Sequence, residues 1–248
     1  MQKRSLVIAN WKMYIESPEV ARAWVAKVGR AKKDAEVWAA VPAPFIPLFA
    51  KSALSVGAQT VSRLDAAHHA HTGEVSATMV KNSGASFTLV GHSERRAAGD
   101  TNEAVHAQFA AALKAGLTVV LCVGEQARSQ DGAHFTYIEE QLRSAFAGAQ
   151  SLAKKVAVAY EPVWAIGKSA EHAMKPPQIE ETVIFIRKVL AEVLGRTAAL
   201  KVPVLYGGSV EPANAHALRY EGGVGGFLIG HASASPEEFL EIVKQCKG

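Results

Sequence analysis

The chain has 248 residues and a formal net charge of +4, and 49% of its residues are hydrophobic. This length suits two small domains or one large α/β domain, and the glycines and prolines are spread out rather than gathered into a linker. Because no basic run is interleaved with aromatic residues, the composition argues against a nucleic-acid partner and suits a small anionic substrate.

Short apolar runs alternate with amphipathic segments along the chain. The runs predict strands at 6–10, 37–41, 58–62, 87–91, 118–123, 156–161, 204–207 and 226–230. Helical patterns lie between them, among them 102–113 before Gly116, 178–194 after Pro176-Pro177, and 236–244 after the capping residue Ser235. Eight strands, each followed by a helix, predict a single-domain α/β fold, a (β/α)8 barrel over residues 1–248. A doubly wound open sheet is the alternative, although it usually has fewer strands and no Gly-x-Gly-x-x-Gly follows the first one here.

The two cysteines, Cys122 and Cys246, lie far apart in the chain and in unlike settings. The sequence therefore predicts neither a disulfide framework nor a metal site, and the expected location is the reducing cytoplasm. The apolar run after Arg4 is too short for a signal peptide, and no stretch is long enough to span a membrane, so no membrane partner is expected.

Residues that follow the predicted strands form the candidate site, because the chemistry of a (β/α)8 barrel collects at the carboxyl ends of its strands. Polar residues and glycines follow strands that are far apart in the sequence. They are Asn10 and Lys12, His92 and Glu94, Glu161, Gly207-Gly208-Ser209, and Gly230-His231. We therefore expect these residues to converge on one pocket.

Glu161 directly follows the run 156–160, which has no polar face and is typical of a strand buried on both sides. Pro162 ends this strand because it cannot donate to a sheet ladder. A carboxylate at the mouth of a buried strand is costly to desolvate, which indicates a catalytic group. The alternative is a strand-end glutamate in a surface salt bridge.

Three further side chains are candidates for chemistry. Lys12 lies at a strand end, where its ammonium can stabilise a developing oxyanion, although a solvated lysine is the commoner case. His92 precedes a helical first turn, and a helix N-terminus disfavours imidazolium, so we expect a neutral ring. Glu94 is either a first-turn acid stabilised by the helix dipole or a charge partner for Lys12.

Two glycine-bearing turns, Gly207-Gly208-Ser209 and Gly230-His231, follow the predicted strands seven and eight. Paired glycines often mark only tight turns. In a barrel, however, these two loops frequently form a phosphate site from backbone N–H groups, and Ser209 adds a hydroxyl.

Taken together, the motifs resemble the triosephosphate isomerase family over nearly the whole chain. They occur in order as Asn10-Trp11-Lys12-Met13, Thr72-Gly73-Glu74, Gly91-His92-Ser93-Glu94-Arg95-Arg96, Cys122-Val123-Gly124-Glu125, the stretch from Tyr160 to Gly167, and the stretch from Tyr206 to Val210. The resemblance implies a TIM barrel that interconverts dihydroxyacetone phosphate and D-glyceraldehyde 3-phosphate by proton transfer through an enediolate. Such an aldose–ketose isomerase serves glycolysis and gluconeogenesis.

The resemblance also implies a role for each residue. Glu161 is the expected base, and His92 polarises the carbonyl and moves protons between the two oxygens. Lys12 offsets negative charge, Asn10 hydrogen-bonds nearby, and Glu94 orients this side of the pocket. The expected phosphate contacts are Asn10, Lys12, Gly167, Ser169, Gly207, Gly208, Ser209, Gly230 and His231. The resemblance implies no metal or organic cofactor.

Two segments have implied roles outside the catalytic group. The stretch from Pro162 to about Ala170 is expected to close over the substrate and exclude water from the enediolate. The stretch from His71 to Glu74 resembles the family's dimer loop, so a homodimer is implied, with Thr72 as a contact.

Two positions depart from the family. The family usually continues Ile-Gly with Thr-Gly-Lys, whereas Gly167 is followed here by Lys168-Ser169-Ala170. Either the lid has lost two residues, or Ser169 replaces its second glycine, whose N–H normally contacts the phosphate. His231 stands where the family usually has a second glycine. Its backbone N–H can still serve a phosphate, and its ring either points outward or, if protonated, adds positive charge.

Two other functions remain open from the residues alone. Another phosphosugar barrel, such as an aldolase or epimerase, is the first; an aldolase needs a Schiff-base lysine on a strand or a metal cluster, and no predicted strand holds an internal lysine. The second is a catalytically inactive barrel that binds phosphate or serves as a scaffold. The presence of Lys12, His92 and Glu161 argues against it.

Overall fold

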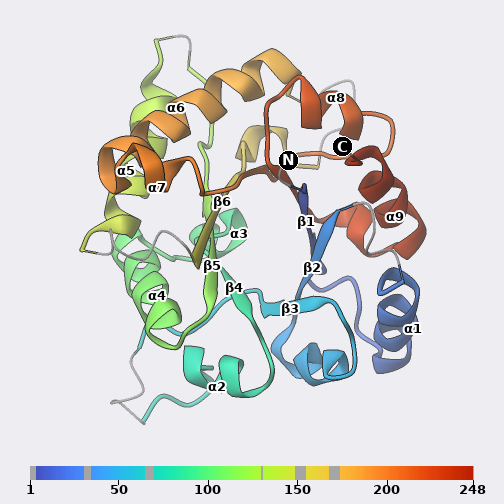
Figure 1. Ribbon diagram of the computed structural model, residues 1–248. Helices are drawn as coiled ribbons and strands as arrows, with labels where there is room; N and C mark the ends of the chain where they lie inside the picture. The colour runs from blue at the N-terminus through green and yellow to red at the C-terminus, as the bar shows by residue number, and fades with distance from the viewer. Residues whose placement is uncertain are drawn as a thin grey trace.

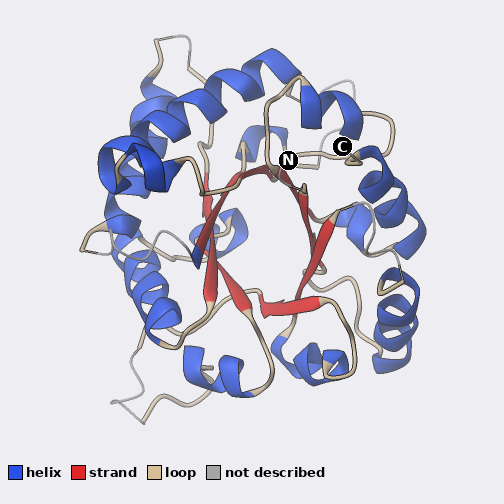
Figure 2. Ribbon diagram, in the orientation of Figure 1, coloured by secondary structure: helices blue, strands red, loops and turns tan. Residues whose placement is uncertain are grey.

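A computed structural model describes residues 4–30, 35–64, 70–129, 131–148, 155–167 and 174–247 of the chain. Within these ranges, eight parallel strands pair in chain order, and β8 pairs with β1 to close a barrel. The strands are β1 (Leu6–Asn10), β2 (Glu36–Val41), β3 (Ser55–Ala58), β4 (Phe87–Val90), β5 (Thr118–Val123), β6 (Val156–Tyr160), β7 (Val204–Tyr206) and β8 (Gly226–Ile229). They form a central ring with the helices packed around its outside (Figures 1 and 2). The predicted (β/α)8 barrel is confirmed.

Among the described residues, α-helices follow the strands as the sequence pattern predicts, except after β2. They are α1 (Pro18–Val28), α2 (Ala77–Asn82), α3 (Ser93–Ala97), α4 (Asn102–Lys114), α5 (Ala133–Phe146), α6 (Pro176–Leu194), α7 (Arg196–Ala199), α8 (Ala215–Tyr220) and α9 (Pro236–Gln245). Ser235 caps α9 by accepting a hydrogen bond from Glu238 N at 3.3 Å, as predicted. Pro176 and Pro177 form the first turn of α6, where their missing N–H groups cost nothing.

Alternate residues of each strand face two different cores. In β1, Leu6 and Ile8 belong to the cluster that fills the barrel interior, whereas Val7 and Ala9 pack against the surrounding helices. All five residues of β6 are buried as well. This burial on both faces explains why the strands read as continuous apolar runs in the sequence.

The position predicted for the third strand, 58–62, is wrong, because β3 ends where that prediction begins. Gly57 lies so close to Phe87 of β4 that a Cβ at this position would be 2.5 Å from the Phe87 carbonyl oxygen. A residue with a side chain cannot make this contact, so Gly57 lies inside the strand and does not mark the point where the strand begins. Beyond β3, Ser62 N donates to Val75 O at 2.9 Å, which ties the chain there to a later loop instead of the sheet.

The connection after β2 is the 3-10 helix η1 (Ala43–Phe49) rather than an α-helix. Pro47 lies inside it and has no backbone N–H to donate, which keeps this segment from forming regular α-helical turns. Short 3-10 helices also follow β6 and β8, as η3 (Val163–Ala165) and η4 (His231–Ser233). η4 carries His231 of the candidate site, and η3 leads into Gly167.

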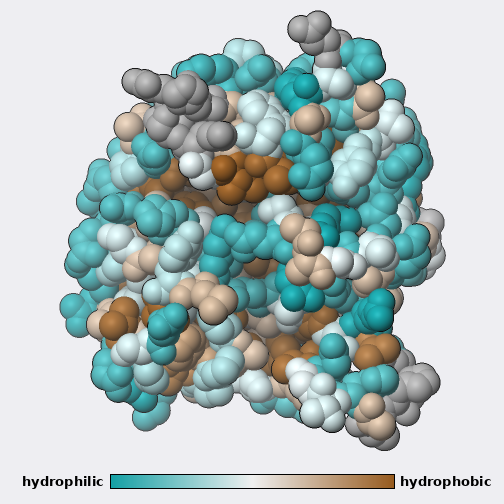
Figure 3. Space-filling view, turned by 180° about the vertical axis from the view of Figure 1, so that it is seen from behind, coloured by the Kyte–Doolittle hydropathy of each residue, from teal (hydrophilic) through white to brown (hydrophobic). Residues whose placement is uncertain are grey.

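The two ends of the described chain lie side by side (Figure 1), and Ser5 Oγ donates to Cys246 O at 3.1 Å. None of the helices among the described residues combines the length and the apolar character needed to cross a membrane. The face shown in Figure 3 is mainly hydrophilic, and its hydrophobic residues form separate small groups.

Candidate active site

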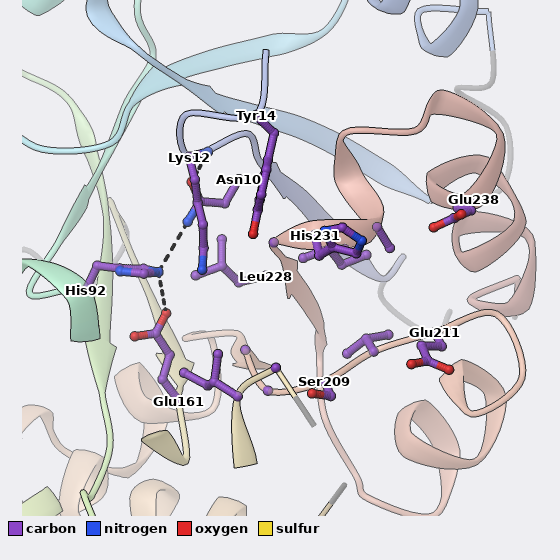
Figure 4. Close-up of a pocket in the computed structure, with 18 of the residues that line it drawn as sticks. Asn10, Lys12, Tyr14, His92, Glu161, Ser209, Glu211, Leu228, His231 and Glu238 are labelled. Atoms are coloured by element: carbon purple, nitrogen blue, oxygen red, sulfur yellow. Dashed lines mark hydrogen bonds and ion pairs between the residues drawn. The ribbon is translucent and has the colours of Figure 1, made fainter. Parts of the chain in front are cut away.

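A pocket of about 840 Å³ lies at the carboxyl ends of the strands, a size suited to a small organic ligand. Figure 4 shows side chains from the ends of β1, β4, β6, β7 and β8, and from the turns that follow them, converging on it. The pocket brings together most of the predicted residues: Asn10, Lys12, His92, Glu161, Gly167, Gly207, Gly208, Ser209, Gly230 and His231. Glu94 lies beside this group and contacts Lys12.

The carboxylate of Glu161 lies at the bottom of the pocket and is almost fully buried, with 2% of the residue exposed. Its Oε2 accepts a hydrogen bond from Ser93 N at 2.9 Å. Its Oε1 lies 3.2 Å from Nε2 of His92. Thus Glu161 faces the predicted histidine and forms no surface salt bridge among the described contacts.

The hydrogen bonds of His92 indicate the protonation of its ring. His92 is the N-cap of α3, and its Nδ1 accepts a hydrogen bond from Glu94 N at 3.2 Å. A nitrogen that accepts from a backbone N–H carries no proton, so the proton of the neutral ring is on Nε2. That N–H has Glu161 Oε1 as its acceptor, while the amide nitrogen of Asn10, itself a donor, lies 3.3 Å from the same Nε2 (Figure 4).

Lys12 has a backbone φ of 45°, in the left-handed region that residues other than glycine rarely adopt. The side chain of Asn10 supports this turn, because its Oδ1 accepts from Lys12 N at 3.2 Å. The ammonium forms an ion pair with Glu94, whose Oε1 lies 2.6 Å from Nζ. Glu94 therefore combines the two alternatives, because it lies in the first turn of α3 and is also the charge partner of Lys12. Such backbone strain is typical of functional sites.

Gln59 is a site residue that the sequence analysis missed. Its side-chain amide donates to Asn10 Oδ1 at 3.2 Å and to Lys12 O at 3.1 Å, so it holds the turn after β1 from the end of β3, two strands away in the barrel. The strand-end rule would have found it, because Gln59 directly follows β3. The misplaced third strand put Gln59 in a strand interior instead.

Two glycines allow the close approach of Glu161 to its neighbours. A Cβ at Gly124 would lie 1.8 Å from the carbonyl oxygen of Glu161, and a Cβ at Gly207 would lie 2.9 Å from its Cγ. The backbone of Gly124 is in turn held by Gln141, which accepts from Gly124 N at 2.9 Å and donates to Gly124 O at 3.1 Å. The sequence analysis did not identify Gln141 as part of this support.

The glycine turns after β7 and β8 form the opposite wall of the pocket. Ser209 Oγ donates to Ala165 O at 3.0 Å, which joins the loop after β7 to η3. A Cβ at Gly230 would lie 3.2 Å from Cε of Lys12, so a glycine leaves room for that side chain. His231 is exposed at the rim, and its ring lies edge-on to Tyr14 with the centroids 5.4 Å apart.

A buried carboxylate anchors the start of the loop that follows Glu161. Glu125 Oε1 accepts from Tyr160 Oη at 2.9 Å and from Trp164 Nε1 at 2.8 Å. Both donors belong to the stretch that carries Glu161, so Glu125 fixes the chain on either side of it. Gly167, the last described residue before the gap, has a φ of 71° and lines the pocket.

Two titratable groups, the buried Cys122 and the half-buried Arg96, interact electrostatically with Glu161. Burial and the nearby Glu161 carboxylate raise the pKa of the Cys122 thiol well above its ordinary value, so the thiol stays protonated. Burial lowers the pKa of Arg96, whose Nε donates to Gly91 O at 2.8 Å and whose Nη1 donates to Asn102 Oδ1 at 2.8 Å. Arg96 therefore holds the β4–α3 turn that carries His92.

The predicted dimer contact Thr72 is not part of the pocket lining. Thr72 lies in the exposed stretch 70–75, where Glu74 N donates to His71 O at 3.2 Å. Ser169 lies outside the described residues, as does most of the predicted lid. Within the described ranges, no group of three or more His, Cys, Asp or Glu side chains is arranged to hold a metal ion.

Comparisons with known proteins agree on one family. The family model described as triosephosphate isomerase matches residues 5–246. The chain is 38% identical to triosephosphate isomerase from Alkalilimnicola ehrlichii, over 99% of both chains, and 40% identical to that from Thiobacillus denitrificans, over 98% of both. Its fold is similar to the crystal structure of triosephosphate isomerase from Bartonella henselae, with a TM-score of 0.85, 31% identity and 98% of each chain covered.

Proposed function

The chain belongs to the triosephosphate isomerase family, and we propose that the residues of its carboxyl-end pocket divide the reaction of that family among them. The enzyme interconverts dihydroxyacetone phosphate and D-glyceraldehyde 3-phosphate. The arrangement of His92 and Glu161, with a donor N–H aimed at a buried carboxylate 3.2 Å away, carries the assignment of roles.

Glu161 acts as the base. A substrate carbonyl oxygen that accepts the Nε2 hydrogen bond of His92 displaces Glu161 Oε1 from that contact and leaves the carboxylate next to the carbon chain. Glu161 then takes a proton from the carbon beside the carbonyl, the C–H electron pair forms the carbon–carbon double bond, and the carbonyl π electrons move to oxygen. Return of the proton to the neighbouring carbon gives the isomer. Ser93 N keeps its hydrogen bond to Oε2 and orients the carboxylate.

His92 acts through its neutral form. Its Nε2–H donates to the oxygen on which negative charge develops, and the proton bound to one substrate oxygen moves to the other through the ring. Because Glu94 N occupies Nδ1, only Nε2 is available to the substrate. The cap of α3 thus fixes both the tautomer and the direction of the ring.

Lys12 supplies positive charge to the enediolate and the phosphate. Its side chain is only 19% exposed, so its field is less screened by water than that of a surface lysine. Glu94 orients the ammonium from the outer side through the ion pair, and Asn10 places a further amide near His92. Together these groups balance the charge that builds up on the substrate oxygens.

The phosphate binds at the backbone of the glycine turns. Gly207, Gly208 and Ser209 after β7 and Gly230 and His231 after β8 line the same pocket as Lys12, and Ser209 and His231 lie on the side away from His92 (Figure 4). Backbone N–H groups in such turns suit an anion because they bring partial positive charge without the cost of ordering a side chain. Gly167, and Ser169 outside the described residues, complete the site when the lid closes and excludes water.

The enzyme works as a homodimer in the cytoplasm. The exposed stretch 70–75 with Thr72 is the docking segment, and apolar side chains near it and near Lys12 are open to solvent: Met13 is 80% exposed and Met79 is 58% exposed. Large exposed apolar side chains of this kind suit an interface. Two free buried thiols, Cys122 and Cys246, suit a reducing compartment.

A coupled assay of glyceraldehyde 3-phosphate conversion tests the assignment. Glu161→Gln keeps the shape of the side chain but removes its basicity, so turnover should vanish. Glu211→Gln is the matched control, since Glu211 lines the same pocket but is exposed and lies away from His92. Equal activity of Glu161→Gln and the wild-type protein would mean that another group is the base or that a host enzyme contaminates the sample.

A further inference from the structure

A second pocket, of about 470 Å³, lies at the other end of the barrel. Its lining includes Leu6, Glu36, Thr118 and Val156, which begin β1, β2, β5 and β6, so it lies at the amino ends of the strands. The two ends of the chain lie at this same end (Figure 1). The barrel interior between the two pockets is filled by the buried inner core, and no residue is shared by their linings.

The charges around this pocket are strongly unbalanced. Of the described lining residues, four are cationic, namely Arg4, Arg187, Lys201 and Arg219, and Glu36 is the single acid. Glu36 Oε1 accepts a hydrogen bond from Trp38 Nε1 at 3.0 Å, so this carboxylate already has a partner. The loop that enters β8 adds only Gly223, Val224 and Gly225, which bring no acidic side chain.

Two of the cations have donors to spare. Arg187 is half-buried on α6, and no hydrogen bond or ion pair to it occurs among the described residues. Burial lowers the pKa of its guanidinium, as expected for a charge held without a counterion. Arg219 donates from Nε to Ser5 Oγ at 2.8 Å and from Nη1 to Val224 O, which fixes its plane and leaves Nη2 without a described acceptor.

The apolar part of the lining sets the size and nature of a ligand. Trp38, Leu200 and Pro203 line the pocket between the cations, and 70% of Leu200 is exposed. A volume of several hundred cubic ångströms exceeds what a bare phosphate ion fills and suits a small organic molecule. Arginine side chains recognise phosphate oxygens through paired N–H donors, whereas an apolar wall suits a ring or hydrocarbon part.

We propose that this pocket is a second ligand site, which binds a small organic phosphate at the end of the barrel opposite the active site. Arg187 and Arg219 contact the phosphate, and Trp38 packs against the organic part. The site binds without reacting, because its described lining holds no histidine and its single acid is engaged by Trp38. Binding here does not depend on the isomerase assignment.

Adenosine 5′-monophosphate is the probe, since it joins a phosphate to an aromatic ring, and calorimetry with the full chain gives its affinity. Arg187→Met should weaken binding roughly 10- to 100-fold, the loss expected for charged hydrogen bonds. Lys188→Met is the matched control: it removes the same charge from the next residue of α6, which is exposed and outside the pocket, and should leave the affinity unchanged. Lys201→Met at the rim provides a second variant if Arg187→Met does not fold.

Two further experiments distinguish binding at this site from binding in the active site and from binding of the aromatic ring without the phosphate. Lys12→Met, which weakens phosphate binding in the active site, should leave one saturable site for the probe, and Trp38→Phe should remove the probe-dependent change in tryptophan fluorescence. Adenosine without phosphate should bind at least 10-fold more weakly. Binding that is lost in Lys12→Met but kept in Arg187→Met, equal binding of adenosine, or no saturable binding would each overturn the proposal.

Discussion

Shortening Glu161 to aspartate tests how closely the site depends on the position of its base. Glu161→Asp withdraws the carboxylate by about 1.5 Å, the length of one carbon–carbon bond. The backbone cannot advance to compensate. Glu161 N is bonded to Val123 O at 2.8 Å, and Gly124 packs so tightly on the Glu161 carbonyl that a Cβ on this glycine would lie 1.8 Å from the carbonyl oxygen.

Because a misplacement of about 1 Å in a catalytic group costs roughly 100-fold in rate, we expect kcat of Glu161→Asp to fall at least about 100-fold, or about 2.7 kcal/mol. KM should stay within about twofold, because the phosphate turns and Lys12 are untouched. The coupled assay measures both constants, and Glu211→Asp is the control for the same shortening elsewhere in the pocket. A kcat within threefold of wild type would refute the idea that the position of this carboxylate limits the rate.

Three other perturbations test the charge, the packing and the titration of the molecule. Lys12→Met should lower kcat/KM by about 100-fold or more, because it removes the charge that faces the enediolate. It should change the free energy of unfolding in urea by less than about 1 kcal/mol, because the ion-pair partner Glu94 is largely exposed. Unchanged kinetics would contradict this role of Lys12. Gln141→Ala leaves the buried N–H and C=O of Gly124 without partners and should cost about 2–4 kcal/mol in urea unfolding, and a loss below about 0.5 kcal/mol would mean that the two bonds do not hold the loop. Burial raises the pKa of the Cys246 thiol from 9.0 to about 12, so the folded protein holds this proton more tightly than the unfolded chain does. The resulting stabilisation is complete below about pH 9 and is lost as the pH rises toward 12. Between about pH 8 and pH 10.5, the free energy of unfolding in urea should therefore fall less for Cys246→Ala than for wild type. An equal fall in the two proteins would contradict this effect of Cys246.

The parts of the site that the sequence predicts are those that follow strands with clear boundaries. Glu161 comes after a run of five buried residues and before a proline. The sequence therefore predicts both where β6 ends and that a carboxylate directly follows it. His92 and Lys12 follow β4 and β1 in the same way. For these residues, local patterns and the strand-end rule are sufficient, because a parallel barrel places all carboxyl ends at one face.

The parts that the sequence could not predict depend on contacts between distant segments. Gly57 lies inside β3 because Phe87 of the next strand occupies the space of its side chain, and no local pattern reports that contact. The predicted strand is therefore placed too late in the chain, and Gln59 is not recognised as a residue that follows a strand. Similarly, Gln141 reads as an ordinary polar position of α5, and only the fold shows that its amide is buried against Gly124.

The same long-range contacts explain why the base and the neutral histidine meet with so little freedom. The His92 ring is oriented by the backbone of α3 through Glu94 N, and the Glu161 backbone is held by β5 through Val123 and the glycine after it. Neither restraint comes from the other catalytic group, so a substrate that replaces the Nε2–Oε1 contact does not release either residue. A barrel achieves this because each strand end is hydrogen-bonded to its neighbours, whereas a pair on two loops would have to be ordered by the substrate itself. By this reasoning, substitutions in the supporting glycines and in Gln141 should reduce kcat even though none of these side chains touches the substrate.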